Sequence, residues 1–191
     1  MTRRTWRCWA LAAMLLAAGT WCTTSALASI PTSGSQAAPL VSSLVPSARV
    51  VGGGRLTWLG FHAYDAVLYA GNARFNDNAP FALELTYARK FKGTAIAERS
   101  IVEIRKLGLA DERELAEWQG LLAGMFPDVV PGDRLTGVSQ ADGTLRFFHN
   151  DRALGTLNDE RLRRAFFSIW LDPRTSAPDL RRKLLGDSGQ R

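Results

Sequence analysis

Two histidines, His62 and His149, are the only imidazole side chains in the sequence, and they stand far apart in the chain. A metal site needs several converging His, Cys or carboxylate ligands. Both cysteines, Cys8 and Cys22, fall in the N-terminal segment, so a thiolate site is not expected in the folded domain. No G-x-S-x-G nucleophile elbow occurs, although the sequence leaves open a Ser–His–Asp group assembled by the fold. We therefore expect no metal site and no cofactor.

Acidic pairs and a glycine run offer two further candidate sites. Asp111 with Glu112, and Asp159 with Glu160, stand where helices are expected to begin, and the helix dipole accounts for carboxylates there without catalysis. Residues 52–54 are three glycines, but no Lys-Ser/Thr pair and no helix follow them, as a phosphate-binding loop requires. Neither feature predicts an active site.

Residues 1–28 have the pattern of a cleavable signal peptide. Three arginines open the segment, residues 10–18 are almost entirely apolar, and Ala26 and Ala28 occupy A-x-A positions. The apolar run is shorter than the roughly 20 residues that a spanning helix needs. We expect cleavage after Ala28, no stable membrane anchor after cleavage, and a periplasmic or secreted protein.

The predicted mature chain is one domain without cysteine. Loss of the three signal-peptide arginines lowers the formal net charge from +6 to +3. The basic residues in 161–164 and 181–183 lie on expected helices, where a solvated face explains them. A nucleic-acid-binding protein concentrates its positive charge and exposed aromatic residues. We expect no nucleic-acid partner, and the sequence identifies no protein partner.

Hydrophobic periodicity and turn signals predict the order of the elements. We expect a flexible lead-in over residues 29–47 with an edge strand near 40–45, a turn at 52–54, and one long strand over 55–70 in which Gly60 marks a bulge. Later elements are a strand over 81–89, helices from Gly93 and from Asp111, a meander over 132–157 with a hairpin turn at Asp142-Gly143, a helix capped by Asn158, and a short helix from Pro178. This order predicts an α+β fold in which an antiparallel β-sheet carries a helical layer on one face.

Four segments resemble the chalcone isomerase-like superfamily, most closely its exported bacterial branch. Residues 59–70 are similar to the long strand of that fold, residues 126–134 to its passage from helix to hairpin, residues 147–150 to a hairpin strand, and residues 166–173 to its penultimate helix and exit loop. The resemblance covers nearly all of the predicted mature chain and implies one chalcone isomerase-like domain over residues 48–187, an open-faced sandwich with a cleft between the long strand and two helices.

The resemblance also implies candidate residues for that cleft. Plant members cyclise chalcones there, and fatty-acid-binding members hold an acyl chain with an arginine facing the carboxylate. The implied ligand-binding residues are Arg55, Tyr64, Lys92, Arg99 and Ser168, with Arg49 in reserve for Arg55. Lys92 and Arg99 stand where the enzymes have a tyrosine and an asparagine, and no catalytic residue is assigned.

Three functions remain open from the sequence. The first is non-catalytic binding of a small amphipathic ligand, such as a fatty acid or an aromatic acid, with Arg55 as partner of the carboxylate. The second is an intramolecular lyase or isomerase acting on chalcone-like substrates, which needs little beyond a positive site and correct orientation. The third is an accessory protein whose pocket is filled by its own side chains.

Overall fold

The computed structural model describes residues 30–31 and 34–187, so the predicted signal peptide lies outside the described residues. Six strands form one antiparallel sheet in which the order in space follows the order in the chain. The strands are β1 (Ala48–Trp58), β2 (Phe61–Gly71), β3 (Phe81–Tyr87), β4 (Arg134–Ser139), β5 (Leu145–His149) and β6 (Arg152–Leu157). The helices of the described part are α1 (Pro39–Leu44), α2 (Gly93–Leu107), α3 (Glu112–Met125), α4 (Glu160–Leu171) and α5 (Pro178–Leu184).

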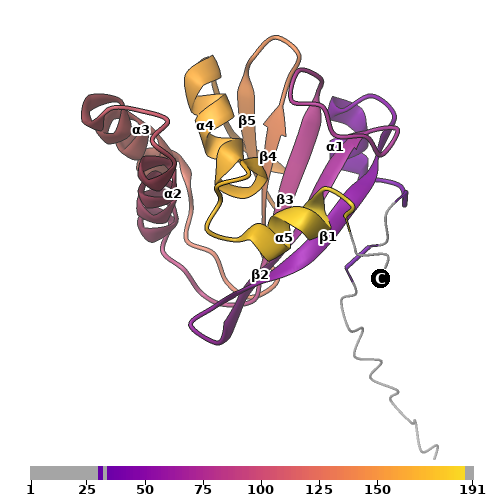
Figure 1. Cartoon of the computed structure of the whole chain (residues 1–191), viewed down its shortest axis with the longest axis horizontal. Coiled ribbons are helices and arrows are strands. Elements are labelled where there is room, and N and C mark those ends of the chain that lie inside the picture. Colours follow the sequence, from indigo (N-terminus) through magenta and orange to yellow (C-terminus); the bar gives the residue numbers. More distant parts are fainter. Residues whose placement is uncertain (1–29, 32–33, 188–191) are drawn as a thin grey trace, which may run out of the picture.

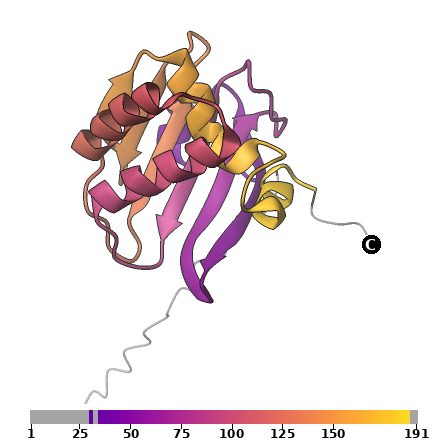
Figure 2. The ribbon, with the colours of Figure 1, turned by 60° about the vertical axis from the view of Figure 1, so that its left-hand side comes forward.

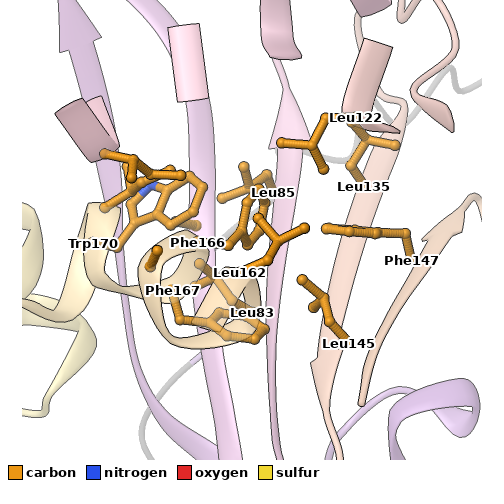
Figure 3. Packing of buried hydrophobic residues seen from close by; sticks show 14 of the residues in the cluster. Leu83, Leu85, Leu122, Leu135, Leu145, Phe147, Leu162, Phe166, Phe167 and Trp170 are labelled. Carbon is orange, nitrogen blue, oxygen red and sulfur yellow. The ribbon is translucent and has the colours of Figure 1, made fainter. Parts of the chain in front are cut away.

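The predicted α+β class is confirmed. Helices α2, α3, α4 and α5 cover one face of the sheet (Figures 1 and 2). Alternate strand residues, such as Leu83 and Leu85 of β3, point into this layer. They meet Phe166 and Trp170 of α4 in the main core (Figure 3). Burial of this apolar face positions the helices against the sheet.

The expected long strand over residues 55–70 was wrong, because the chain reverses within it. β1 ends at Trp58 and β2 begins at Phe61, and the two strands pair with each other. Leu59 and Gly60 form the turn with φ of 48° and 78°. The bulge lies at Ala63 rather than at Gly60, since Leu56 pairs with Tyr64 while Thr57 pairs with His62. Period-two alternation continues through the hairpin, which is why the pattern looked like a single strand.

The turn expected at residues 52–54 was also wrong, because these glycines lie inside β1. Because they lack a side chain, they allow neighbouring segments to come close to β1. A Cβ atom at Gly52 would lie 2.0 Å from the backbone oxygen of Lys183, and one at Gly54 would lie 2.9 Å from Leu180. The glycines let α5 pack directly against β1.

The edge strand expected near residues 40–45 is instead the helix α1. Pro39 occupies its first turn, where the missing N–H costs nothing. Val41 of this helix and the adjoining Val45 are fully buried against Val50 and Val67, which face away from the main core. Gln36 also pairs with Arg49 in a β-bridge. The end of the predicted lead-in is therefore ordered and covers part of the second face of the sheet.

Most later boundaries agree with the sequence prediction. Asp111 and Glu114 form the expected capping box of α3. Gly143 has φ of 86° in the turn between β4 and β5. The cap of α4 differs by one residue, because Asp159 rather than Asn158 accepts the N–H of Leu162. The same carboxylate accepts Nε1–H of Trp118 at 3.0 Å and so links α3 to α4.

Candidate ligand-binding site

A cavity of about 410 Å³ lies between the helix-covered face of the sheet and the helices α2 and α4. Its volume falls in the usual range for small-molecule sites. Strands β1 to β5 form its floor, and α2, α4 and the segment leading into α5 form its walls. The helical layer of the fold therefore encloses a space and does not fill it completely.

The cavity is apolar at one end and polar at the other. Leu135 and Gly137 of β4, Phe147 of β5 and Phe126 after α3 line the end beneath the second half of the sheet. Polar side chains gather at the opposite end, near β1 and β2: Thr57, Tyr64, Arg99, Ser100, Glu103 and Ser176. This polarity suits a molecule with an apolar body and a polar head.

Tyr64 supplies a hydroxyl group at the polar end. Its oxygen accepts Nε1–H of Trp170 at 2.9 Å, and the structure gives its own O–H no acceptor among the described residues. Burial raises the pKa of Tyr64 to about 12, with the hydrogen bond from Trp170 acting in the opposite direction. The phenol therefore stays protonated at neutral pH, where it can donate to an anionic group but cannot serve as a base.

Arg99 and Glu103, one helical turn apart on α2, form the charged part of the site. Nη2 of Arg99 lies 2.5 Å from the Glu103 carboxylate, which also contacts Nζ of Lys106 at 3.0 Å and accepts Oγ–H of Ser176 at 2.5 Å. Burial opposes ionisation of Glu103, but the hydrogen bonds from Ser176 and Lys106 outweigh it and lower the pKa. Two cations thus share one carboxylate, which leaves net positive charge beside Tyr64.

Arg99 is exposed and also lines the cavity, so its side chain faces both the cavity and the solvent. It also stands 5.6 Å from the ring centroid of Trp58, which lines the same end of the cavity. An arginine at this position can pair with a carboxylate through two parallel hydrogen bonds. The polar end of the cavity therefore meets the solvent beside Trp58 and Arg99, which are both exposed lining residues.

Two of the residues implied by the family resemblance, Tyr64 and Arg99, line the cavity together. Arg55 does not, because it lies next to Leu56 in β1 and points to the opposite face of the sheet. There its Nε donates to the Asp65 carboxylate at 2.9 Å, and His62 contacts the same carboxylate at 3.1 Å. Arg55 is therefore withdrawn as the partner of a ligand carboxylate.

Lys92 and Ser168 also lie outside the cavity lining. Lys92 precedes the first turn of α2, is well exposed, and binds Asp128 at 2.6 Å. Ser168 is half-buried in α4, one position from the lining residue Ile169. Arg49, the reserve for Arg55, lies in the part of β1 that pairs with Ala70, at the far end of the hairpin from Tyr64.

Sequence reasoning missed Glu103, Ser176 and Ser100. The helical spacing of Arg99 and Glu103 was visible, because such pairs face one another on a helix. No sequence pattern pointed to Ser176 as a site residue, because its approach to α2 depends on the turn after α4. Ser100 donates its hydroxyl proton to the backbone oxygen of Ile96 at 2.9 Å, so its oxygen can still accept a hydrogen bond from a ligand.

The part of the chain that the structure describes contains no group of three or more His, Cys, Asp or Glu side chains placed to hold a metal ion. None of its helices has both the length and the apolar character needed to cross a membrane.

Comparison with known proteins agrees with this geometry. A family model described as chalcone isomerase-like matches residues 57–186, which is more than half of the chain. The chain belongs to the chalcone isomerase-like family. Among solved structures, it is similar to the fatty-acid-binding protein AtFAP1 of Arabidopsis thaliana, with a TM-score of 0.57, 16% identity, and coverage of 74% of this chain and 88% of that chain. No curated protein matches the sequence significantly. At 16% sequence identity, the similarity to AtFAP1 shows that the two proteins have the same fold.

Proposed function

We propose that this chalcone isomerase-like protein is a non-catalytic binder of a small amphipathic anion such as a fatty acid or an aromatic acid. The observation that carries the proposal is the polarity of the cavity, which is apolar under β4 and β5 and cationic beside Arg99. The apolar part of the ligand would lie on Leu135 and Phe147, and its carboxylate would meet Arg99 and Tyr64. The similarity of fold to a fatty-acid-binding protein supports the same proposal.

The cavity favours binding over proton transfer. An acid–base catalyst works best when its pKa lies near the operating pH. Tyr64, one of the two tyrosines that line the cavity, has its pKa raised far above that range by burial. Glu103 is held in its charged form by Ser176 and Lys106. Both groups are suited to hold a ligand in place.

The test combines native mass spectrometry with calorimetric titration of a long-chain fatty acid. We expect the wild-type protein to bind the fatty acid and to bind the matching alkyl alcohol more weakly. Arg99→Gln should weaken fatty-acid binding about tenfold or more, because a hydrogen bond to a charged group contributes about 1.5–3 kcal/mol. Alcohol binding should change little.

Arg55→Gln is the matched control, because Arg55 lies on the opposite face of the same strand pair. It should leave fatty-acid affinity unchanged. Equal loss of affinity in both variants would contradict the proposed site. Enzymatic cyclisation of a chalcone, at a rate above the spontaneous one and lost in Arg99→Gln, would show instead that the protein is the intramolecular lyase.

We also propose that the protein acts after export, as a periplasmic or secreted member of the family. The charge, apolar run and A-x-A site of residues 1–28 support this proposal. Fractionation of expressing cells with intact-mass measurement tests it. We expect the exported fraction to contain a chain beginning at Ser29. A full-length chain confined to the cytoplasmic fraction would contradict export.

A further inference from the structure

The hairpin tip, residues 58–61 between β1 and β2, exposes an unusual amount of apolar surface. Trp58 is 52% exposed, Leu59 74% and Phe61 56%. Only two other large apolar residues of the described chain, Leu121 and Val130, are comparably exposed. The tip extends beyond the neighbouring strands in both views of the ribbon (Figures 1 and 2). Contiguous exposed apolar surface of this kind marks an interaction site.

The backbone at Leu59 is a second and independent observation. Leu59 has φ of 48° and Gly60 has φ of 78°, so both turn residues adopt the left-handed region. Two-residue hairpin turns of this type favour Asn-Gly, because asparagine tolerates positive φ better than leucine does. The turn therefore keeps a large apolar side chain at a position where a polar one would be less strained. Such local conflicts concentrate at functional positions.

Cations surround the apolar tip. The guanidinium of Arg89 stands 4.5 Å from the ring centroid of Phe61, and that of Arg99 stands 5.6 Å from Trp58. Arg89 and Lys90 lie in the loop between β3 and α2, which reaches the hairpin through the bond from Ala88 N–H to the Ala63 oxygen. Both are exposed, and neither forms an ion pair within the described residues.

We infer that the hairpin tip docks the protein onto an anionic lipid surface. Tryptophan and other aromatic residues favour the membrane–water interface, and unpaired arginine and lysine are attracted to anionic head groups. The tip extends beyond the neighbouring strands (Figures 1 and 2), so its exposed apolar side chains can reach between lipid head groups. Trp58 also lines the cavity, so docking would place the polar end of the cavity at the bilayer.

Vesicle co-sedimentation tests this inference without any cavity ligand. The probes are vesicles of phosphatidylcholine alone and of phosphatidylcholine mixed with phosphatidylglycerol. Wild type and all variants are expressed and purified in the same way and therefore share the same N-terminus. Any contribution of the residues before the domain to vesicle binding is then equal in every measurement. We expect binding to the mixed vesicles, weaker binding to the neutral ones, and a loss of binding as salt screens the charges.

Leu59→Asn is the decisive variant, because asparagine suits the turn and should leave thermal stability unchanged or higher. It should reduce affinity for the mixed vesicles about tenfold or more, given the apolar area that leucine would bury. Lys90→Gln should reduce the affinity about fivefold. Leu121→Gln, which removes a comparably exposed leucine from α3, should leave it unchanged.

Fatty-acid titration in free solution separates this inference from the proposed function, since Leu59 does not line the cavity. Loss of vesicle binding in Leu59→Asn with unchanged fatty-acid affinity supports docking through the tip. Absence of binding to mixed vesicles at low salt would overturn the inference and leave the tip as a surface for a protein partner. Equal binding by wild type and Leu59→Asn would overturn it as well.

Discussion

The hydroxyl oxygen of Tyr64 accepts a hydrogen bond from Nε1 of Trp170 over 2.9 Å, which joins β2 to α4 across the polar end of the cavity. Both side chains also line the cavity. The contact therefore ties the helical layer to the sheet and leaves the Tyr64 O–H without an acceptor among the described residues.

Tyr64→Phe should destabilise the protein by about 1–2 kcal/mol, because the indole N–H of Trp170 loses its partner in a largely buried position. Urea unfolding measures the loss. The same variant should weaken fatty-acid binding, since the donor to the carboxylate is removed. Tyr87→Phe is the control. Tyr87 packs edge-on against Tyr64 and lines the same cavity, but its hydroxyl makes no hydrogen bond within the described structure. A similar loss in both variants would contradict the role given to the Trp170 contact.

The three tyrosines of the chain should titrate together, and only at high pH. Burial raises the pKa of Tyr64 to about 12 and raises the pKa of Tyr69 and of Tyr87 further. Because the folded pKa exceeds the unfolded value of about 10, the folded state favours the neutral phenols. The free energy of unfolding should be unaffected by these groups at neutral pH and should fall as pH rises above about 10.

Near-ultraviolet absorbance at increasing pH checks this expectation. The native protein should show little tyrosinate near pH 10, where a denatured control has titrated half of its phenols. Tyrosinate should then appear together with loss of the folded circular dichroism signal. If one tyrosine of the folded protein instead titrated near pH 10, that side chain would be more solvated than its packing indicates.

Glu84→Gln should stabilise the protein at neutral pH. Glu84 is almost fully buried on the face of the sheet opposite the cavity, close to Arg134 and Thr136. Burial raises the pKa of Glu84, and the nearby Arg134 and the Thr136 hydroxyl offset only part of this effect. The contribution of Glu84 to stability is therefore greatest when the group is protonated and is lost as pH rises through its folded pKa.

Urea unfolding of wild type and Glu84→Gln at several pH values measures the effect. The variant should have the higher free energy of unfolding at neutral pH, and the difference should shrink as pH falls toward about 4, where the unfolded carboxyl also protonates. Thr136→Val is not an equivalent change, because it leaves the buried carboxylate with one partner fewer and should destabilise the protein. A Glu84→Gln variant less stable than wild type at neutral pH would show that the Arg134 ion pair dominates.

Local signals in the sequence predicted much of the fold. The capping box at Asp111 and the Asp142-Gly143 turn each depend on neighbouring residues alone, and both were placed correctly. The Leu59-Gly60 turn was missed because leucine is not a residue that such turns favour. Helix α1 was missed because a six-residue helix is held by tertiary contacts, here those of Val41 with the sheet.

The candidate site was less predictable for a geometric reason. Whether a strand residue faces the cavity depends on register, and one inserted residue reverses every later side chain. Arg55 and Tyr64 would have shared a face only with a bulge between them on one strand. They instead belong to different strands, and Tyr64 pairs with Leu56 while Arg55 pairs with Asp65. Arg99 and Glu103 lie side by side because of helical spacing alone, but Arg99 was named from the family resemblance and the spacing to Glu103 was not used.

The approach of α5 to β1 gives a last test, because it explains the glycines at positions 52 and 54 of β1. A Cβ atom at position 52 would come within 2.0 Å of the Lys183 oxygen and 2.8 Å of the Leu184 oxygen, both in the backbone of α5. Gly52→Ala should therefore push α5 from the sheet and cost about 1–3 kcal/mol, as overpacked sites do.

Gly120→Ala is the matched control, because the position is exposed in α3 and a Cβ atom there meets no other atom within 4 Å. Alanine has the higher helix propensity, so this variant should gain about 0.5–1 kcal/mol. Urea unfolding gives both values, and hydrogen exchange at Leu180 and Leu184 reports whether α5 has moved. Equal stability of the two variants, with α5 still protected, would show that β1 can shift to admit a side chain and that the glycines serve another purpose.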